Sequence, residues 1–245
     1  QAESVQTGLA HMAGGEKPPP PLTEAAVAKW ERARVDPLAD FAGPPPVRAV
    51  FAYGSLVFRP GFRFQRAYPA CVRGFRRRFW QKSCDHRGTP ERPGRVVTLV
   101  RAEDVQGEEE DTAARTGIVH GIAYEVADDE WDAVIEELDV RERYGYMRTA
   151  EWLYPVGENP AVEEPLARAV VYYCYKPQEN AIYCGPESTE EAAAVIAFAE
   201  GPSGRNDAYC FALEAALRQH GLPPDPYLTD ISRRVRAMQA QARQE

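Results

Sequence analysis

TGIVHGIAYEV (residues 116–126) and ARAVVYYCY (residues 167–175) are the clearest strands in the sequence. Both concentrate β-branched and aromatic side chains, which is typical of strands packed against a core. Shorter runs of the same kind occupy Arg48–Tyr53, Arg76–Gln81 and Arg95–Val100. These runs predict a sheet formed mainly by the middle of the chain.

Helix signals dominate the C-terminal part. Start signals lie at Ser188 with Glu191, at Asn206 and at Asp225-Pro226, and stop signals at Gly201 and Gly221. The first pair has the spacing of a capping box, and proline after aspartate is typical of a first helical turn. A further helix is expected over 128–139. The pattern predicts an α+β fold, a mostly antiparallel sheet or barrel flanked by helices.

The first 46 residues differ in composition from the rest. They include four successive prolines, Pro18 to Pro21, and a proline-rich spacer at 43–46. Such a segment buries too little apolar surface to offset its ordering entropy. We expect 1–46 to be a largely disordered extension with a short helix at 23–35, and 47–243 to form a single catalytic domain.

Bulk composition excludes some functions. The chain of 245 residues has a net charge of −8, which disfavours general binding to nucleic acids or membrane surfaces because both are anionic. No apolar run reaches the roughly 20 residues of a membrane span, and no secretory signal is visible. An odd number of cysteines without a Cys-x-x-Cys pair, at positions 71, 84, 174, 184 and 210, predicts free thiols in a reducing compartment, the cytoplasm.

Three segments are candidates for chemistry, at residues 51–56, 76–90 and 136–146. In Phe51-Ala52-Tyr53-Gly54-Ser55-Leu56 a strand-like run meets glycine, which permits a close ligand approach, although most such junctions are plain turns. The Gly-x-Ser-x-Gly pattern of a nucleophile elbow is absent, so Ser55 is not proposed as a nucleophile. Residues 76–81 place three arginines next to two aromatics, which fits either RNA binding or a strand with paired arginines, and the acidic chain favours the strand.

Acidic and histidine residues elsewhere lack a metal-binding pattern. The acidic run at 103–111 has no alternating ligands, so a solvated loop is expected there rather than a calcium site. Asp85 and His86 have no second ligand at suitable spacing, which disfavours a metal and favours a hydrogen-bonded loop histidine. Glu142 follows the expected helix between two arginines, and composition alone does not favour it over Glu137.

Taken together, these segments resemble the ChaC-type, glutathione-specific γ-glutamylcyclotransferases. The matching motifs run in order across about 47–235: FAYGSL (51–56), RRRFWQKSCDHRGTPERPGRVVTLV (76–100), GIAYEV (121–126), LDVRERYGY (138–146) and GPSGRN (201–206). The resemblance implies a small β-barrel with surrounding helices. It also implies conversion of glutathione to 5-oxoproline and Cys-Gly without a cofactor or metal. Ala52 and Tyr144 stand where the family usually has glycine.

The resemblance also assigns roles to residues. Glu142 is implied as the proton acceptor. Substrate contacts are implied for the segment Val50, Phe51, Ala52, Tyr53, Gly54 and Ser55, to which we add Leu56 for its backbone N–H and Tyr183 for its hydroxyl. An ordinary glutamate is about 3–4 pKa units less basic than an α-amine, so proton transfer would be easier if burial raised its pKa. We therefore expect Glu142 to be buried despite its arginine neighbours.

Three other functions remain open from the sequence. The first is a cyclotransferase that acts on other γ-glutamyl amino acids or amines, although the 76–100 motif favours glutathione. The second is a non-catalytic protein that binds a γ-glutamyl compound or a protein partner, for which the sequence identifies no particular partner. RNA binding is the third.

Overall fold

The computed structural model describes residues 48–105, 117–142, 146–157, 164–174 and 180–244. The 1–46 extension with its expected helix at 23–35, most of the acidic loop and Tyr144 lie outside these residues. Among the described residues, no helix is long and apolar enough to cross a membrane.

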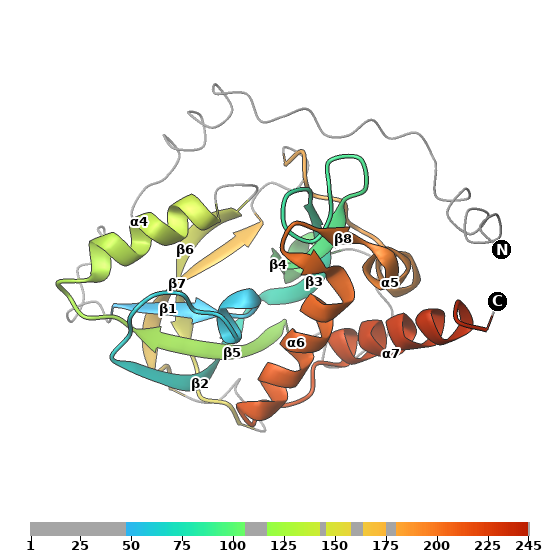
Figure 1. The fold of residues 1–245 in the computed structure, drawn as a ribbon. Coiled ribbons are helices and arrows are strands. Elements are labelled where there is room, and N and C mark those ends of the chain that lie inside the picture. Colours follow the sequence, from blue (N-terminus) through green and yellow to red (C-terminus); the bar gives the residue numbers. More distant parts are fainter. Residues whose placement is uncertain (1–47, 106–116, 143–145, 158–163, 175–179, 245) are drawn as a thin grey trace.

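The main sheet has five strands in the order β2-β5-β1-β7-β6 (Figure 1). In that order they are Arg66–Arg73, Ile118–Glu125, Ala49–Ala52, Ala167–Cys174 and Tyr146–Leu153. Every pairing is antiparallel except that of β1 with β7. The two edge strands also meet, because Cys71 and Tyr154 exchange two backbone hydrogen bonds of 2.9 Å. The sheet therefore curls so that its edges touch at one point.

Two further sheets have two strands each. β3 (Phe75–Ser83) pairs with β4 (Gly94–Arg101), with an irregularity between Arg78 and Gln81. β8 (Glu200–Gly201) and β9 (Gly204–Arg205) form a small hairpin, and the 3-10 helices η1 and η2 span Ser55–Val57 and Ala102–Asp104. The strands expected from the sequence are confirmed. β2 was not predicted, since it contains Pro69, which an edge strand tolerates.

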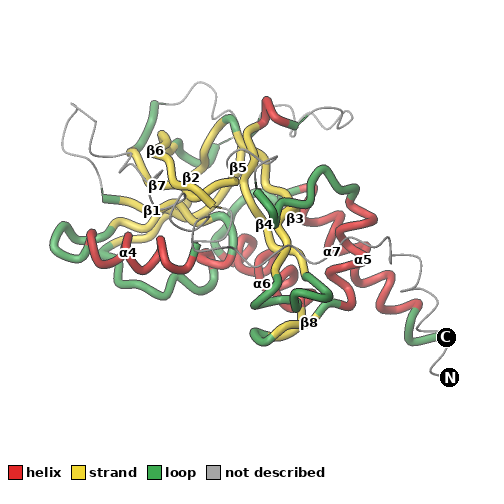
Figure 2. The backbone as a smooth tube through the Cα atoms, turned by 90° about the horizontal axis from the view of Figure 1, so that it is seen from above, coloured by secondary structure: helices red, strands yellow, loops and turns green. Residues whose placement is uncertain are grey.

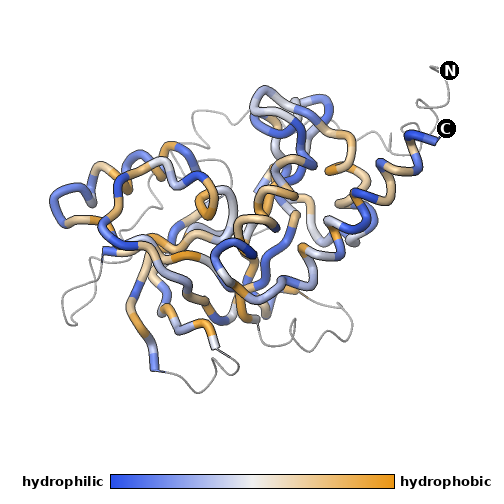
Figure 3. Tube along the Cα trace, turned by 60° about the horizontal axis from the view of Figure 1, so that its bottom comes forward, coloured by the Kyte–Doolittle hydropathy of each residue, from blue (hydrophilic) through white to orange (hydrophobic). Residues whose placement is uncertain are grey.

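Four α-helices complete the described fold. They are α4 (Trp131–Arg141), α5 (Thr189–Phe198), α6 (Asn206–Gln219) and α7 (Pro226–Gln241). Figure 2 shows α4 beside the five-stranded sheet, α5 and α7 at the opposite end, and α6 between them; α5 and α6 contact β4. Figure 3 shows hydrophobic and hydrophilic residues alternating along the C-terminal helix, α7, as expected for a helix with one buried face. The α+β class is confirmed.

The helix start signals were read correctly in two cases out of three. Ser188 and Glu191 form the capping box, and Asp225 caps α7 by accepting from the Leu228 N–H at 3.1 Å. The prediction that Asn206 caps α6 is wrong, because Arg205 holds that position. The buried Asn206 amide instead forms two hydrogen bonds with the backbone of β4. It accepts from the Arg95 N–H at 2.6 Å and donates to the Arg95 carbonyl at 2.7 Å.

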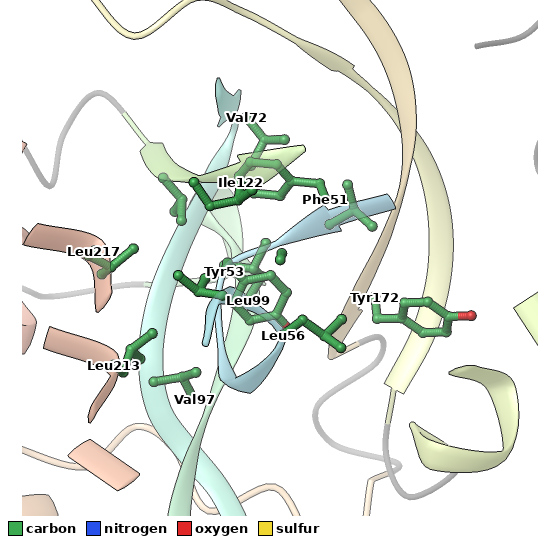
Figure 4. Packing of buried hydrophobic residues seen from close by; sticks show 14 of the residues in the cluster. Phe51, Tyr53, Leu56, Val72, Val97, Leu99, Ile122, Tyr172, Leu213 and Leu217 are labelled. Atoms are coloured by element: carbon green, nitrogen blue, oxygen red, sulfur yellow. The ribbon is translucent and has the colours of Figure 1, made fainter. Parts of the chain in front are cut away.

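The core lies between the sheet and the helices, and β1 passes through it. All four β1 residues are buried, and Figure 4 shows part of the cluster that surrounds them. Gly121 on β5 makes this packing possible, because a Cβ there would lie 2.1 Å from the Ala52 carbonyl oxygen and 2.7 Å from the Phe51 ring. β1 is therefore held firmly where it enters the Tyr53-Gly54-Ser55 loop.

Candidate active site

Glu142 lies at the C-terminal end of α4. Its backbone N–H closes the helix by donating to the Leu138 carbonyl at 2.8 Å, so its side chain leaves the helix at a fixed point. That side chain is only 17% exposed. The expectation of a largely buried Glu142 is confirmed.

The end of α4 is fixed to the sheet by Asp139. Its carboxylate accepts from the Tyr172 hydroxyl at 2.8 Å and from Arg148 at 3.1 Å, which connects the helix to β7 and β6. In Figure 4 the Tyr172 hydroxyl points away from the labelled core cluster. Because Asp139 lies three residues before Glu142, this contact positions the glutamate as well.

Arg141 connects Glu142 with the glycine-containing loop. Its Nη2 donates to the Ser55 hydroxyl at 2.7 Å, and its Nη1 to the Arg59 carbonyl at 3.3 Å. Its Nε lies 3.5 Å from a carboxylate oxygen of Glu142. Two segments separated by more than 80 positions in the sequence are thereby brought to one place, as the family resemblance requires.

The loop itself is tightly held. Arg77, buried in β3, donates from Nε to the Tyr53 carbonyl at 3.0 Å. At Gly54 a Cβ would lie 3.0 Å from the Val97 side chain and 3.5 Å from the Tyr209 hydroxyl oxygen. The close approach of β4 and α6 therefore favours glycine at this position.

Three tyrosines near Glu142, two of them buried and Tyr146 partly buried, bind the middle of β4. Tyr146 donates to the Val97 carbonyl at 2.8 Å, and the Tyr209 hydroxyl accepts from the Val97 N–H at 3.4 Å. Tyr53 is hydrogen-bonded to Leu99 and Thr98. Burial raises the pKa of all three phenols, and the negative charge of Glu142 contributes in each case. The phenols are therefore neutral at physiological pH.

Burial also raises the pKa of Glu142. Electrostatic interactions with Arg141 and, more weakly, with His86 oppose this rise. The C-terminal end of α4 carries a partial negative charge, which acts in the same direction as burial. The result is a carboxyl group that accepts a proton more readily than an exposed glutamate does.

The structure separates the predicted site residues into groups. Gly54 and Ser55 lie in the loop beside Glu142, and Tyr53 lies in the buried tyrosine cluster. The side chains of Val50, Phe51, Ala52 and Leu56 are buried in the core. Tyr183 pairs with Gln81 and packs edge-on against Trp80, with ring centroids 6.2 Å apart, in a small cluster outside the main core. A substrate contact for Tyr183 stays a prediction.

Other neighbours of the site were not singled out from the sequence. Tyr146 falls in the motif that contains Glu142, so a signal for it was present. Arg77 falls in the 76–100 motif, although that motif gave it no role in the site. Tyr209 comes from a distant segment that no local pattern marks. Asp85 and His86 form the expected loop hydrogen bond, 2.8 Å long. Among the described residues, no group of three or more His, Cys, Asp or Glu side chains could hold a metal.

Comparison with known proteins identifies the family. The sequence model described as ChaC-like protein matches residues 48–238. The chain belongs to the ChaC-like family. It is 38% identical over 171 residues to glutathione-specific gamma-glutamylcyclotransferase 1 of Danio rerio, covering 69% of this chain and 78% of that protein. It is also 38% identical over 190 residues to gamma-glutamylcyclotransferase 2-3 of Arabidopsis thaliana, covering 76% and 87%.

A solved structure shows the same fold. The crystal structure of the yeast gamma-glutamylcyclotransferase specific to glutathione matches with a TM-score of 0.66 and 32% identity, covering 78% of this chain and 98% of that one. The family's fold is thus confirmed for the α+β domain described above.

Proposed function

We propose that this protein degrades glutathione by cyclising its γ-glutamyl group, releasing 5-oxoproline and Cys-Gly. The observation that carries the proposal is Glu142, a largely buried carboxyl of raised pKa that is joined through Arg141 to the Gly54-Ser55 loop. Two of the relatives, from Danio rerio and yeast, are named for this activity on glutathione.

The reaction needs little more than a positioned proton acceptor. The α-amine of the γ-glutamyl group attacks its own side-chain carbonyl carbon, forming one C–N bond while the bond to the cysteine nitrogen breaks. Ring closure is intramolecular, so the protein mainly has to hold the reactive conformer. Glu142 takes the proton that the ammonium loses and returns it to the departing nitrogen. Its raised pKa reduces the uphill cost of the first transfer.

The developing oxyanion requires hydrogen-bond donors. We assign this role to the backbone N–H groups of Ser55 and Leu56, which begin the 3-10 helix η1 and therefore have no acceptor inside it. We assign substrate contacts to the Val50–Leu56 segment through its backbone, since several of its side chains fill the core. Tyr53 contributes a neutral, buried phenol near Glu142. The Tyr183 hydroxyl is a further candidate for a substrate contact.

The test replaces Glu142 by glutamine, which preserves its shape but cannot accept the proton. We expect kcat for 5-oxoproline release from glutathione to fall roughly 10²–10⁴-fold, with KM largely kept. Glu137→Gln is the matched control, because Glu137 is an exposed carboxylate of the same helix. A Glu142→Gln enzyme with the wild-type rate would rule out this assignment.

A second candidate is a cyclotransferase for other γ-glutamyl compounds. The name of the Arabidopsis thaliana relative gives no glutathione specificity, which keeps this alternative open. A panel of glutathione, γ-Glu-Ala and γ-Glu-Lys distinguishes the two. We expect glutathione to have the highest kcat/KM by at least tenfold.

We further propose that 47–243 is the catalytic unit and that the protein works in the cytoplasm. The family match over 48–238 supports the first point. The five cysteines carry free thiols, three of them buried, which supports a reducing compartment. Fractionation of the tagged protein, with 5-oxoproline release measured in each fraction, tests the location.

A further inference from the structure

Arg87 occupies an unusual position beside the site. It lies in the loop between β3 and β4, and its Nη1 donates to the Ser203 carbonyl at 2.8 Å and the Arg205 carbonyl at 3.2 Å. Its guanidinium carbon lies 5.7 Å from the ring centroid of Tyr209. The hydroxyl oxygen of the same tyrosine lies 3.5 Å from the Cβ position of Gly54. The Tyr209 ring therefore lies between Arg87 and the Gly54-Ser55 loop.

The guanidinium of Arg87 is only partly used. Within the described ranges, its Nε and Nη2 donate no hydrogen bond, and no acidic side chain lies within ion-pair distance of it. The nearby acids have other partners, since Asp85 bonds to His86 at 2.8 Å and Asp207 to Arg205 at 2.6 Å. Arg87 is therefore half-buried and held through Nη1, while its Nε and Nη2 can still donate hydrogen bonds to a ligand.

A second cation stands near Arg87. Arg59 is exposed, and its carbonyl accepts from Arg141, the residue that also contacts Ser55 and Glu142. Its positive charge helps to lower the pKa of Arg87, after the larger effect of burial. In the described part of the chain Arg59 has no acidic partner either. Two neighbouring positive charges repel each other, and a bound carboxylate would relieve that repulsion.

We propose that Arg87, assisted by Arg59, binds the glycine carboxylate of glutathione and so determines specificity for the tripeptide. This inference rests on the proposed function. Planar guanidinium donors match a carboxylate, and two are available on Arg87.

The glycine carboxylate fits this position better than the α-carboxylate of the γ-glutamyl group does. The α-carboxylate is attached to the same carbon as the attacking amine, so it must lie close to the largely buried Glu142. The glycine carboxylate lies two residues beyond the reacting carbonyl, a reach of up to about 7 Å. That reach suits Arg87, whose guanidinium carbon lies 5.7 Å from the Tyr209 ring centroid, while the hydroxyl of the same ring lies 3.5 Å from the Cβ position of Gly54.

The test compares two substrates on the same variants. Glutathione and its glycine ethyl ester differ only in the charge of the carboxylate in question. In the wild type we expect kcat/KM to favour glutathione about 10- to 100-fold, the range of a charge-assisted hydrogen bond. In Arg87→Gln this preference should fall to about threefold or less, mainly through KM. Arg59→Gln should reduce it partially, and Arg87→Lys should restore part of it.

Using two substrates on one protein separates specificity from folding, because a folding defect lowers both rates equally. Arg92→Gln, which replaces an exposed arginine of the same loop, is the matched control and should keep the full preference. Equal losses on both substrates in Arg87→Gln, or a wild type that does not distinguish them, would overturn the proposal.

A binding measurement separates this inference from the proposed function. Calorimetric titration of both compounds into the Glu142→Gln protein measures recognition of the carboxylate without turnover. Tighter binding of glutathione than of its ester, lost on adding Arg87→Gln, supports the carboxylate site even if the wild type releases no 5-oxoproline. Equal binding of the two compounds overturns it.

Discussion

Arg77 holds the carbonyl of Tyr53 at 3.0 Å through its Nε, and it does so from a side chain that is 2% exposed. Its other nitrogens donate to the His120 carbonyl at 2.6 Å and pair with Asp225, the cap of α7. One buried guanidinium therefore joins the β1 loop, β5 and α7. The loop beside Glu142 is positioned by this residue.

Replacing Arg77 should destabilise the protein strongly. Arg77→Met leaves Asp225 without its cation and two carbonyls without a donor, so we expect the free energy of unfolding to fall by about 3–5 kcal/mol. Urea unfolding measures this. Arg236→Gln breaks a more exposed pair with Glu214 and should cost at most about 1 kcal/mol. Similar losses in the two variants would contradict a positioning role for Arg77.

The ionised Glu142 carboxylate is expected to lower the stability of the folded protein at neutral pH. Its folded pKa lies above the ordinary value of 4.5, so the folded state binds this proton more tightly than the unfolded state does. The stability associated with protonation is complete below the unfolded pKa and is lost as pH rises through the folded pKa. We therefore expect Glu142→Gln to raise the melting temperature at pH 7.5 relative to wild type, with a smaller difference at pH 4.5. A pH-independent difference would argue against a raised pKa.

Arg141 should influence the pH at which activity falls on the acid side of the pH–rate profile. Its positive charge lowers the pKa of Glu142, so Arg141→Gln should raise that pKa further. The acid limb of log kcat/KM would then move to higher pH, and Arg141→Lys should move it less. Arg63→Gln, at the opposite end of α4 where Arg63 pairs with Glu130, should leave the limb unchanged. An unshifted limb in Arg141→Gln would indicate that another group limits the rate.

Much of the fold could be predicted from local sequence. The runs that became β1, β3, β4, β5 and β7 carry the residues typical of strands, and the capping box at Ser188 needs only its own neighbours. β2 was missed because Pro69 argues against a strand until its place at the sheet edge is known. Asn206 was misjudged for a related reason, since its partner Arg95 lies 111 positions away.

The sequence by itself determined most of the strand and helix segments, and the order of its motifs marked Glu142 and the Phe51–Leu56 loop through a family resemblance. Only the tertiary structure decided why Glu142 differs from Glu137. The docking of α4 through Asp139 and Tyr172 buries one carboxylate beside three neutral phenols and leaves the other in solvent. Desolvation depends on neighbours from every part of the chain, and so do the contacts of Arg77 and Arg87. Local patterns carry no record of such neighbours, because the residues become adjacent only when the chain folds.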